Sequence, residues 1–252
     1  MANDKKISQA AEWLKHARHA IALTGAGVST RSGIPDFRSP GSGLWKRADP
    51  MNVASMWGFI EYPQGFYDWV KPLAQTLLTA QPNPAHCALA ELETLGCLRA
   101  IITQNIDDLH QRAGSKRVLQ VHGHLRQATC IRCYHMVEAQ PLFEKFLADS
   151  DLPTCEICGG VMKPNVVLFG EMLPVSVMYE ATEESKRCDV MLIAGSSLEV
   201  APAADLPLVA KKNGAKLIIV NNSSTVLDSQ AALILREDVT SALPKVVAQM
   251  RK

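Results

Sequence analysis

The chain has 252 residues and a nearly balanced charge, with 26 Lys and Arg against 25 Asp and Glu. This length suits one large domain, or one domain with a small insertion, and the balanced charge gives no reason to expect nucleic acid or a membrane surface as the main partner. No apolar run approaches the roughly 18–20 residues that span a bilayer, and we therefore expect a soluble cytoplasmic protein.

A glycine turn at residues 25–27 follows the first predicted strand. A helix that begins near Ser8 leads into a buried strand at residues 20–24, which ends at Gly25 and Gly27. In a doubly wound sheet, such a turn feeds the amino-terminus of a helix and directs N–H groups at an anion, so a dinucleotide pyrophosphate is the expected ligand. A tight turn that only packs strand against helix is the alternative. Thr30 stands where the dehydrogenase fingerprint requires a third glycine, which makes a dehydrogenase the least favoured enzyme class.

The next two segments differ in character from the strand and the turn before them. Residues 29–38 are too irregular for a core helix and too rich in functional side chains for a spacer. Residues 41–82 are rich in aromatic side chains. We predict a small helical module there, either with an apolar groove or as a cover over the glycine turn, and most of its rings should fill its own core.

Two further strands end in polar residues. After a helix from Asn83 to Gly96, a strand at residues 98–103 ends in Gln104-Asn105-Ile106-Asp107, and a strand at residues 118–121 ends in His122. Since ligands bind at the carboxyl ends of parallel strands, these residues should face the same crevice as the glycine turn. His122 is the candidate base, because the ordinary pKa of imidazole suits proton transfer at neutral pH. A purely structural histidine is the alternative.

Two Cys-x-x-Cys pairs, separated by 21 residues, form a metal-binding pattern in the middle of the chain. Four thiolates in two such knuckles suit one closed, tetrahedral, structural zinc site, and the predicted ligands are Cys130, Cys133, Cys155 and Cys158. The alternatives are two disulfides, against which a reducing compartment argues, and a redox pair, which lacks a surrounding thioredoxin-like pattern. The other cysteines lie in apolar contexts and are expected to be buried small hydrophobes: Cys87, Cys97 and Cys188.

The last third of the chain repeats an α/β rhythm. An extended stretch ends at Glu171, and it is followed by a helix at residues 174–187, a strand at 189–194, a helix at 202–212 and a last strand at 216–221. The polar turn Gly195-Ser196-Ser197 offers a second site for an anion, and Asn221 ends the last strand. This alternation predicts an α/β fold, a Rossmann-like doubly wound parallel sheet with a smaller zinc-binding module and a helical module.

Four strand ends thus converge on one crevice, and the assembly resembles the sirtuins, the NAD-dependent protein deacylases. The resemblance runs from about residue 20 to residue 222, with motifs in the expected order: GAGVSTRSGIPDFR, PNPAH, TQNIDDLHQRAG, VHG, two C-x-x-C pairs, PNVVLFGE, GSSLEV-x-PAA and IVN. With this resemblance we assign residues 1–40, 83–123 and 166–252 to an NAD-binding domain. Residues 41–82 and 124–165 together would form a small domain.

The resemblance implies an enzyme that moves an acyl group, most simply acetyl, from a lysine side chain to the ADP-ribose of NAD, and releases nicotinamide and free lysine. NAD is then a co-substrate, one zinc ion is structural, and acylated-lysine proteins or peptides are the partners. The oligomeric state stays open, and a monomer is compatible with the sequence. Two alternatives remain: protein mono-ADP-ribosyl transfer, which shares the first step, and a zinc-ribbon binding module with a degenerate nucleotide fold.

Residue roles are implied by the same resemblance. His122 and Asn105 would be catalytic, as the base and as the group that orients the ribose or a water, and Asp108 would be a solvated neighbour of the site. The implied cofactor-binding residues are Gly25, Ala26, Gly27, Thr30, Asp36, Phe37, Arg38, Gln104, Ile106, Asp107, Gly195, Ser196, Ser197, Asn221 and Val239. The acylated peptide would add as a strand between residues 197–200 and an edge formed by Val166, Val167, Leu168, Phe169, Gly170 and Glu171.

The residue three positions after Tyr67 bears on which acyl group can be removed. Family members that remove malonyl or succinyl groups pair a tyrosine with an arginine three residues later, and here Tyr67 is followed at that spacing by Val70. Without the arginine, an acidic acyl chain would bury an unpaired charge. We therefore expect acetyl or another neutral acyl group.

Overall fold

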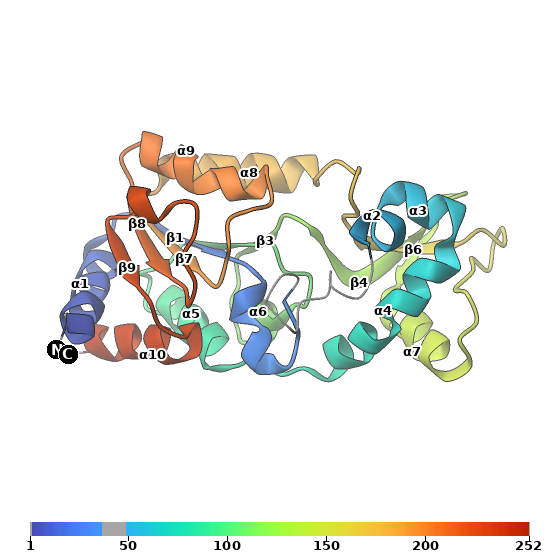
Figure 1. Cartoon of the computed structure of the whole chain (residues 1–252), viewed down its shortest axis with the longest axis horizontal. Helices are drawn as coiled ribbons and strands as arrows, with labels where there is room; N and C mark the ends of the chain where they lie inside the picture. Colours follow the sequence, from blue (N-terminus) through green and yellow to red (C-terminus); the bar gives the residue numbers. More distant parts are fainter. Residues whose placement is uncertain (1, 37–48, 252) are drawn as a thin grey trace.

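The computed structural model describes residues 2–36 and 49–251 (Figure 1). A six-stranded sheet with its helices occupies one end of the long axis, and a three-stranded sheet with its own helices occupies the other. Phe37 and Arg38, both expected to bind the cofactor, lie outside the described residues.

The large sheet is parallel throughout, with strand order β3-β2-β1-β7-β8-β9. Its strands are nearly continuous apolar runs, as expected when helices cover both faces of a sheet. Their bounds are β1 Ala20–Thr24, β2 Ala100–Thr103, β3 Val118–Gln120, β7 Val190–Ala194, β8 Lys216–Val220 and β9 Leu233–Leu235. The predicted α/β fold is confirmed, although the expectation that Asn221 ends the last strand is wrong, because β9 follows and forms the sheet edge.

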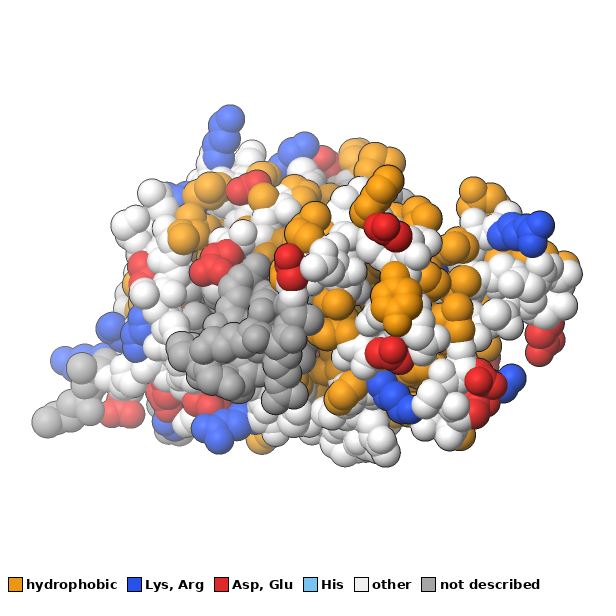
Figure 2. Space-filling view, turned by 45° about the vertical axis from the view of Figure 1, so that its right-hand side comes forward, with side chains coloured by type: hydrophobic (Ala, Val, Ile, Leu, Met, Phe, Trp, Pro, Cys, Tyr) orange, Lys and Arg blue, Asp and Glu red, His pale blue; other side chains and the backbone are white. Residues whose placement is uncertain are grey.

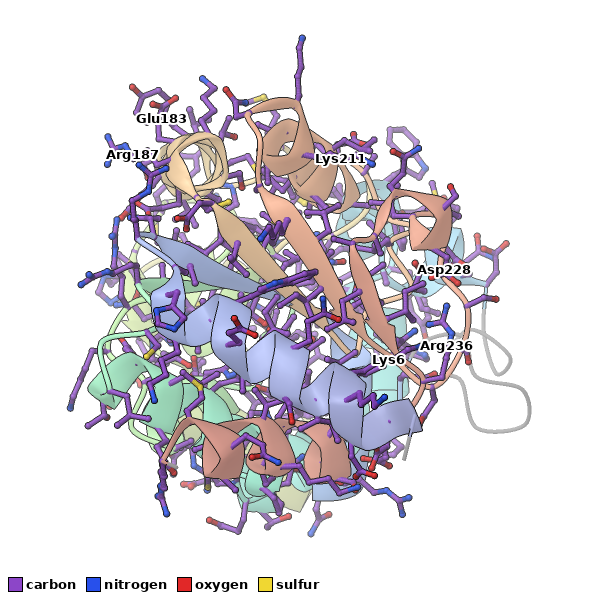
Figure 3. The ribbon with its side chains drawn as sticks, turned by 90° about the vertical axis from the view of Figure 1, so that its left-hand side faces the viewer. Lys6, Glu183, Arg187, Lys211, Asp228 and Arg236 are labelled. Carbon is purple, nitrogen blue, oxygen red and sulfur yellow. The ribbon has the colours of Figure 1, made fainter. Side chains whose placement is uncertain are left out.

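Two layers of helices enclose this sheet. Helices α1 (Ala2–His16), α5 (Pro84–Thr94) and α10 (Val239–Met250) pack on one face, and α8 (Val175–Arg187) and α9 (Leu206–Lys212) pack on the other. Figure 3 shows this arrangement, with Arg187 of α8 and Lys211 of α9 on the opposite side of the sheet from Lys6 of α1. In the described part of the chain, no helix has the length and apolar character that a membrane crossing requires.

The helix that precedes β2 begins and ends as the sequence predicts. The side chain of Asn83 accepts a hydrogen bond from the amide of Ala85 at 2.9 Å, Pro84 occupies the first helical position, and Gly96 follows the helix with a φ of +76°. Such a cap satisfies one of the N–H groups that a helix start leaves unpaired.

The small sheet is antiparallel, in the order β5-β4-β6. Its strands are β4 Gly123–Cys130, β5 Met136–Glu138 and β6 Met162–Val166, and its helices are α2 Pro50–Val53, α3 Met56–Glu61, α4 Pro63–Thr79 and α7 Ala139–Asp149. One hydrophobic cluster joins Phe59, Phe66 and Tyr67 from the helical segment to Phe143 and Phe146 of α7. The two segments therefore share one core, and the helical module is confirmed over its described residues, 49–82.

In residues 2–36 and 49–251, the remaining helical elements are short turns, namely η1 Ala26–Val28, η2 Thr30–Ser32, α6 Leu109–Arg112, η4 Ala203–Asp205 and η5 Asp228–Gln230. The expectation that a helix begins directly after the glycine turn is wrong. Two single turns of 3₁₀ helix follow instead, because the chain reverses at Gly33, whose φ is +89°.

Two smaller expectations also fail. Helix α1 starts at Ala2, not near Ser8, because Ile7 already belongs to its buried face. Among the three unassigned cysteines only Cys188 is buried, whereas Cys87 is exposed and Cys97 is half-buried. Cys87 lies on the outer face of α5, opposite the buried Leu89.

Candidate functional site

Two backbone turns, at residues 25–27 and at residues 195–196, pack against each other at the carboxyl ends of β1 and β7. The amide of Gly27 donates to the carbonyl of Gly195 at 2.8 Å, and Gly195 has a φ of +58°. A Cβ at position 27 would lie 2.8 Å from the Gly195 oxygen, and one at position 195 would lie 2.4 Å from the amide nitrogen of Val28. Backbone packing therefore accounts for these glycines by itself, and a phosphate at the turn stays a prediction.

The hydroxyl of Ser29 joins the ends of β1 and β2. It donates to Oδ2 of Asp107 at 2.6 Å, and Nδ2 of Asn105 donates to it at 3.1 Å and to the carbonyl of Gly25 at 3.1 Å. The other carboxylate oxygen of Asp107 accepts from the amide of Leu109 at 3.0 Å. Burial raises the pKa of Asp107, and the hydrogen bonds from Ser29 and Leu109 oppose that rise. The predicted site residues Asn105 and Asp107 thus meet at one buried serine.

The supporting residues of this network are the part of the site that the sequence analysis missed. Nδ1 of His86 accepts from the amide of Asn83 at 3.2 Å, so in the neutral ring the proton is on Nε2, which lies 3.4 Å from the Ser29 hydroxyl. His110 packs against His86 with ring centroids 4.9 Å apart, and its Nε2 lies 2.9 Å from the hydroxyl of Thr24. Burial lowers the pKa of His86 to about 4 and that of His110 to about 3. The available sequence signal was His86 at the third helical position after Asn83, as in a capping box.

The imidazole of His122 approaches from the end of β3. Its Nδ1 lies 3.1 Å from the carbonyl oxygen of Gln104. Because a carbonyl can only accept, Nδ1 carries the proton and Nε2 of the neutral ring has the lone pair. Burial lowers the pKa of His122, and the hydrogen bond to Gln104 acts in the opposite sense. A neutral imidazole with this tautomer is the form that a general base requires.

These groups line one cavity of about 520 Å³. Its polar wall contains the predicted residues Gln104, Asn105, Ile106, Asp107 and His122, with Ala26 and Ser29 beside them. The opposite wall is mostly apolar and comes from α4 and from residues 166–173. The structure therefore gathers both predicted catalytic residues and four of the predicted cofactor residues around one space.

The other described cofactor candidates lie outside that cavity. The hydroxyl of Ser196 accepts from Nε2 of Gln104 at 3.3 Å, the hydroxyl of Thr30 donates to the carbonyl of Gly27 at 3.1 Å, and Nδ2 of Asn221 donates to the carbonyl of Ser223 at 3.0 Å. Asp36 and Ser197 are half-buried. The side chain of Val239 belongs to the core at the start of α10, so that only its backbone could meet a ligand.

The predicted substrate edge, residues 166–171, lines the same cavity as His122. The amide of Val167 donates to the carbonyl of His122 at 2.9 Å. Phe169 bonds to the helical segment in both directions, since its amide donates to Ala54 and its carbonyl accepts from Met56, each at 2.9 Å. Phe169 and Met172 are both exposed at the cavity, and Figure 2 shows hydrophobic side chains gathered over this half of the molecule. The rim of the cavity is therefore apolar.

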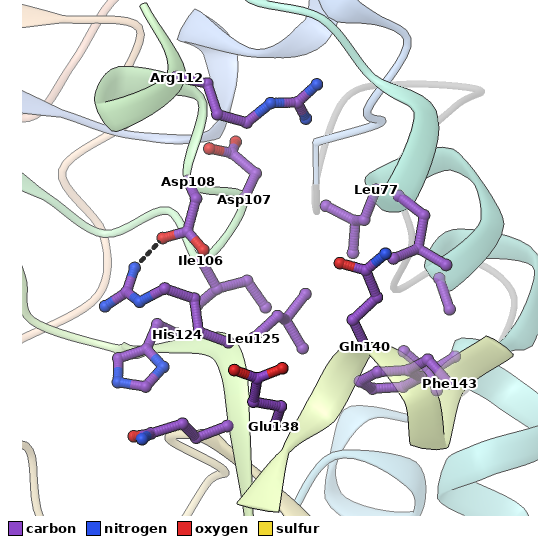
Figure 4. Close-up of a pocket in the computed structure, with 15 residues that line it drawn as sticks. Leu77, Ile106, Asp107, Asp108, Arg112, His124, Leu125, Glu138, Gln140 and Phe143 are labelled. Atoms are coloured by element: carbon purple, nitrogen blue, oxygen red, sulfur yellow. Dashed lines mark hydrogen bonds and ion pairs between the residues drawn. The ribbon is translucent and has the colours of Figure 1, made fainter. Parts of the chain in front are cut away.

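A second cavity, of about 800 Å³, adjoins the first (Figure 4). The two share a set of lining residues, Val70, Leu77, Ile106, Asp107 and Leu125. Asp108 lines the second cavity, and its expected role as a solvated neighbour is wrong. Its carboxylate accepts from the guanidinium of Arg126 and from Nε2 of Gln120, the latter at 2.8 Å, because a φ of +56° at Asp108 turns the chain toward β4.

The four predicted zinc ligands come together in the small sheet. Their sulfur atoms all lie within 4.8 Å of one another, with Cys130 3.5 Å from Cys158 and Cys133 3.6 Å from Cys155. A tetrahedral zinc ion with Zn–S bonds of about 2.3 Å separates its sulfurs by about 3.8 Å, whereas a disulfide needs about 2.0 Å. A Cβ at Gly160 would lie 2.9 Å from Sγ of Cys130, so a glycine is required beside the cluster. The thiols fit one structural zinc ion and are not disulfides.

Comparison with known proteins assigns the chain and its fold to one family. Residues 25–202 match the sequence model of the Sir2 family. A protein named NAD-dependent protein deacylase 2 from Archaeoglobus fulgidus is 45% identical over 99% of this chain and 98% of its own length, and an NAD-dependent protein deacetylase from Sulfolobus acidocaldarius is 42% identical over 98% and 96%.

Solved structures agree with the sequence comparison. A Sir2 enzyme structure superimposes with a TM-score of 0.92 at 45% identity, covering 98% of both chains. A Sir2 enzyme bound to a myristoylated histone peptide has a TM-score of 0.84 at 41% identity, covering 98% of this chain and 97% of its own. A third Sir2 enzyme, bound to a propionylated peptide, has a TM-score of 0.86 at 41% identity, covering 94% of this chain and 95% of its own.

Proposed function

This chain belongs to the Sir2 family, and on that premise we propose that it is an NAD-dependent protein lysine deacylase. It transfers the acyl group of a modified lysine to the ADP-ribose of NAD, and nicotinamide and free lysine are the other products. The observation on which this conclusion rests is the meeting of His122, Asn105 and Asp107 in one cavity whose opposite wall is apolar.

His122 acts as the general base. Its Nδ1–H is held by the Gln104 carbonyl, so the basic Nε2 is available to accept a proton from a ribose hydroxyl. Because burial lowers the pKa of His122, the ring is neutral at physiological pH and ready to take that proton. NAD supplies the ribose that becomes the acyl acceptor.

Asp107 and Asn105 bind the nicotinamide end of NAD. The carboxylate of Asp107 can accept from the carboxamide N–H of nicotinamide, a donor that suits an acceptor-only group. Both hydrogen bonds from Asn105 Nδ2 go to protein atoms, Gly25 O and Ser29 Oγ, which leaves its Oδ1 to orient a ribose hydroxyl or a water. Ile106 provides an apolar wall between them, and the two glycine turns with Ser196 and Asn221 hold the remainder of the dinucleotide.

The acyl group is neutral. The α4 wall of the cavity is formed by Phe66, Trp69, Val70, Leu73 and Leu77, with no charged side chain among these five. Tyr67 is not part of that wall, because its side chain is buried and its hydroxyl donates to the carbonyl of Met162 at 2.6 Å. Relatives bound to myristoylated and propionylated peptides support acyl chains longer than acetyl as further substrates.

Residues 1–40, 83–123 and 166–252 form the NAD-binding domain of this proposal, and residues 41–82 and 124–165 form the small domain that contains zinc. Zinc holds the β4 and β6 ends together and takes no part in the reaction. Seven cysteines without a disulfide suit a reducing compartment, and we assign the protein to the cytoplasm. Cell fractionation tests that assignment.

Mass spectrometry of reaction products is the direct test of the function. Purified protein with NAD and a panel of acylated peptides should yield deacylated peptide, nicotinamide and O-acyl-ADP-ribose, with acetyl and other neutral acyl groups preferred over succinyl. Release of nicotinamide must depend on the acyl group. Labelling of protein with ADP-ribose in the absence of an acylated peptide would instead support ADP-ribosyl transfer.

A further inference from the structure

Lys163 of β6 is an unusual buried lysine at the foot of the substrate edge. The residue is 9% exposed, and its ammonium group contacts the carbonyl of Val166 and the carboxylate of Glu171. A charged group in such a place is unfavourable unless its hydrogen bonds and its charge are compensated. The groups around the ammonium must therefore supply this compensation.

The Lys163 ammonium is compensated by two carbonyls and one carboxylate. Nζ donates to the carbonyls of Pro164 at 3.3 Å and Val166 at 2.8 Å, and it forms an ion pair with Oε2 of Glu171 at 2.9 Å. The carbonyls bind two of its three N–H donors, and the carboxylate balances its charge. The lysine thus ties its own strand to the carboxylate at the far end of the substrate edge.

Glu171 closes the turn from the other side. Its Oε2 also accepts from the amide of Leu168 at 2.8 Å, and its own amide donates to the carbonyl of Leu168 at 3.0 Å. Gly170, with a φ of +87°, allows the backbone to reverse between them. Lys163 and Glu171 therefore fix both ends of the segment from Val166 to Leu168, and we call this pair the edge clamp.

The edge clamp occupies backbone groups of residues 166–168 and so limits those that can bond to a ligand. The carbonyl of Val166 is held by Lys163, the amide of Val167 by the carbonyl of His122, and the amide of Leu168 by Glu171. Within the described residues, no donor is found at the carbonyl of Val167. An incoming peptide strand pairs through such backbone groups, so the clamp presents one acceptor next to the base.

We propose that the Lys163–Glu171 clamp is a positioning device for the acylated peptide, and that it sets peptide affinity without contacting NAD. This proposal rests on the function proposed above. Replacing a buried ion pair by apolar side chains often leaves stability unchanged or raises it, so stability alone does not require the pair here. A role in positioning predicts that an apolar replacement restores the fold but not the binding of peptide.

Calorimetric titration with an acetyl-lysine peptide and with ADP-ribose, together with Tm, tests the proposal on Lys163→Met, Glu171→Leu and the double variant. Each single variant should lower Tm and weaken the peptide Kd by about tenfold, the effect of losing about one hydrogen bond. The double variant should recover part of the lost Tm, because no unpaired charge remains, and should keep the weakened peptide Kd, while ADP-ribose binds all variants as it binds the wild type. The matched control is the exposed pair Lys186–Glu183 on α8, whose Lys186→Met/Glu183→Leu variant should behave as wild type.

The outcomes separate the two proposals. A double variant that recovers both Tm and wild-type peptide affinity would mean that the pair only stabilises the fold. Single variants with unchanged peptide Kd would overturn the positioning role as well. A wild-type protein that binds ADP-ribose but no acylated peptide would contradict the proposed function itself, and the clamp with it.

Discussion

The carboxyl edge of the large sheet and the small sheet with its thiol cluster use their polar groups in different ways. At the large sheet, buried and half-buried polar side chains meet each other: Ser29 bonds to both Asn105 and Asp107, which joins two segments of chain. In the small sheet and its helices, buried aromatic rings fill the core, and the hydroxyl of Tyr67 among them is satisfied by a single backbone carbonyl and not by a side-chain network.

The carboxyl edge of the large sheet holds the reacting groups, and the small sheet with its helices gives the cavity its shape. A connected polar network in a low-dielectric site holds catalytic groups in one arrangement, because an unpaired member would be costly. An aromatic core closed by a metal fixes the positions of α4, β4 and β6, whose side chains form the opposite wall of the cavity. Changes in the first region should alter turnover most, and changes in the second should alter stability most.

The largest expected effect comes from removing the metal. Cys155→Ser should lose zinc and unfold the small sheet, because structural zinc contributes on the order of 10 kcal/mol to the folding of such modules. Metal analysis and thermal unfolding measure both. A Cys155→Ser variant that is metal-free, well folded and active would contradict the structural role of zinc in the small sheet.

His122→Ala should remove deacylation without disturbing the fold. General bases contribute about 100- to 10,000-fold in rate, and the bond that would be lost with this ring is the one to the carbonyl of Gln104. Steady-state kinetics give the loss, while Tm and zinc content should match the wild type. Turnover that persists in this variant would remove His122 from the role of base.

The wild-type pH profile is the companion measurement. A base must be neutral, and burial lowers the pKa of His122 below its ordinary value of 6.5. Deacylation should therefore be lost as pH falls through a value below 6.5, and the profile should be flat with respect to this group above it. An acid limb centred well above 6.5 would contradict the assignment.

Ser29→Ala deletes one buried hydroxyl from the polar network. It leaves Oδ2 of Asp107 without its 2.6 Å donor, so we expect KM for NAD to rise about tenfold, the equivalent of one lost hydrogen bond to a charged group. KM for the peptide should change little. Equal increases in both values would show that the serine only supports the fold.

Tyr67→Phe is the matched control for Ser29→Ala, because it deletes one buried hydroxyl from the small domain. Its bond to the Met162 carbonyl has the same length, 2.6 Å, as that of Ser29 to Asp107. We expect a loss of about 1 kcal/mol in the free energy of unfolding, with kcat, KM and acyl preference unchanged. Denaturant unfolding and a panel of acyl peptides measure the two parts, and a changed acyl preference would assign Tyr67 to the pocket.

The elements and the placement of most site residues could be predicted from the sequence alone. Apolar runs of strand length, the Asn83 cap and the strand-end rule for parallel sheets were sufficient to bring Gln104 to Asp107, His122 and the glycine turn to one edge. The spacing of the cysteines was sufficient for the thiol cluster. Each of these features depends on local pattern or on topology, which a sequence displays directly.

The pairing of the polar side chains could not be predicted from the sequence and is seen only in the tertiary structure. Ser29 lies 78 residues from Asp107 along the chain, and His86 lies 57 residues from Ser29, so no local pattern links them. The same holds for Asp108 with Arg126 and for Tyr67, which faces the core and not the cavity. Side-chain direction and partner are set by packing between distant segments, and packing exists only once the chain has folded.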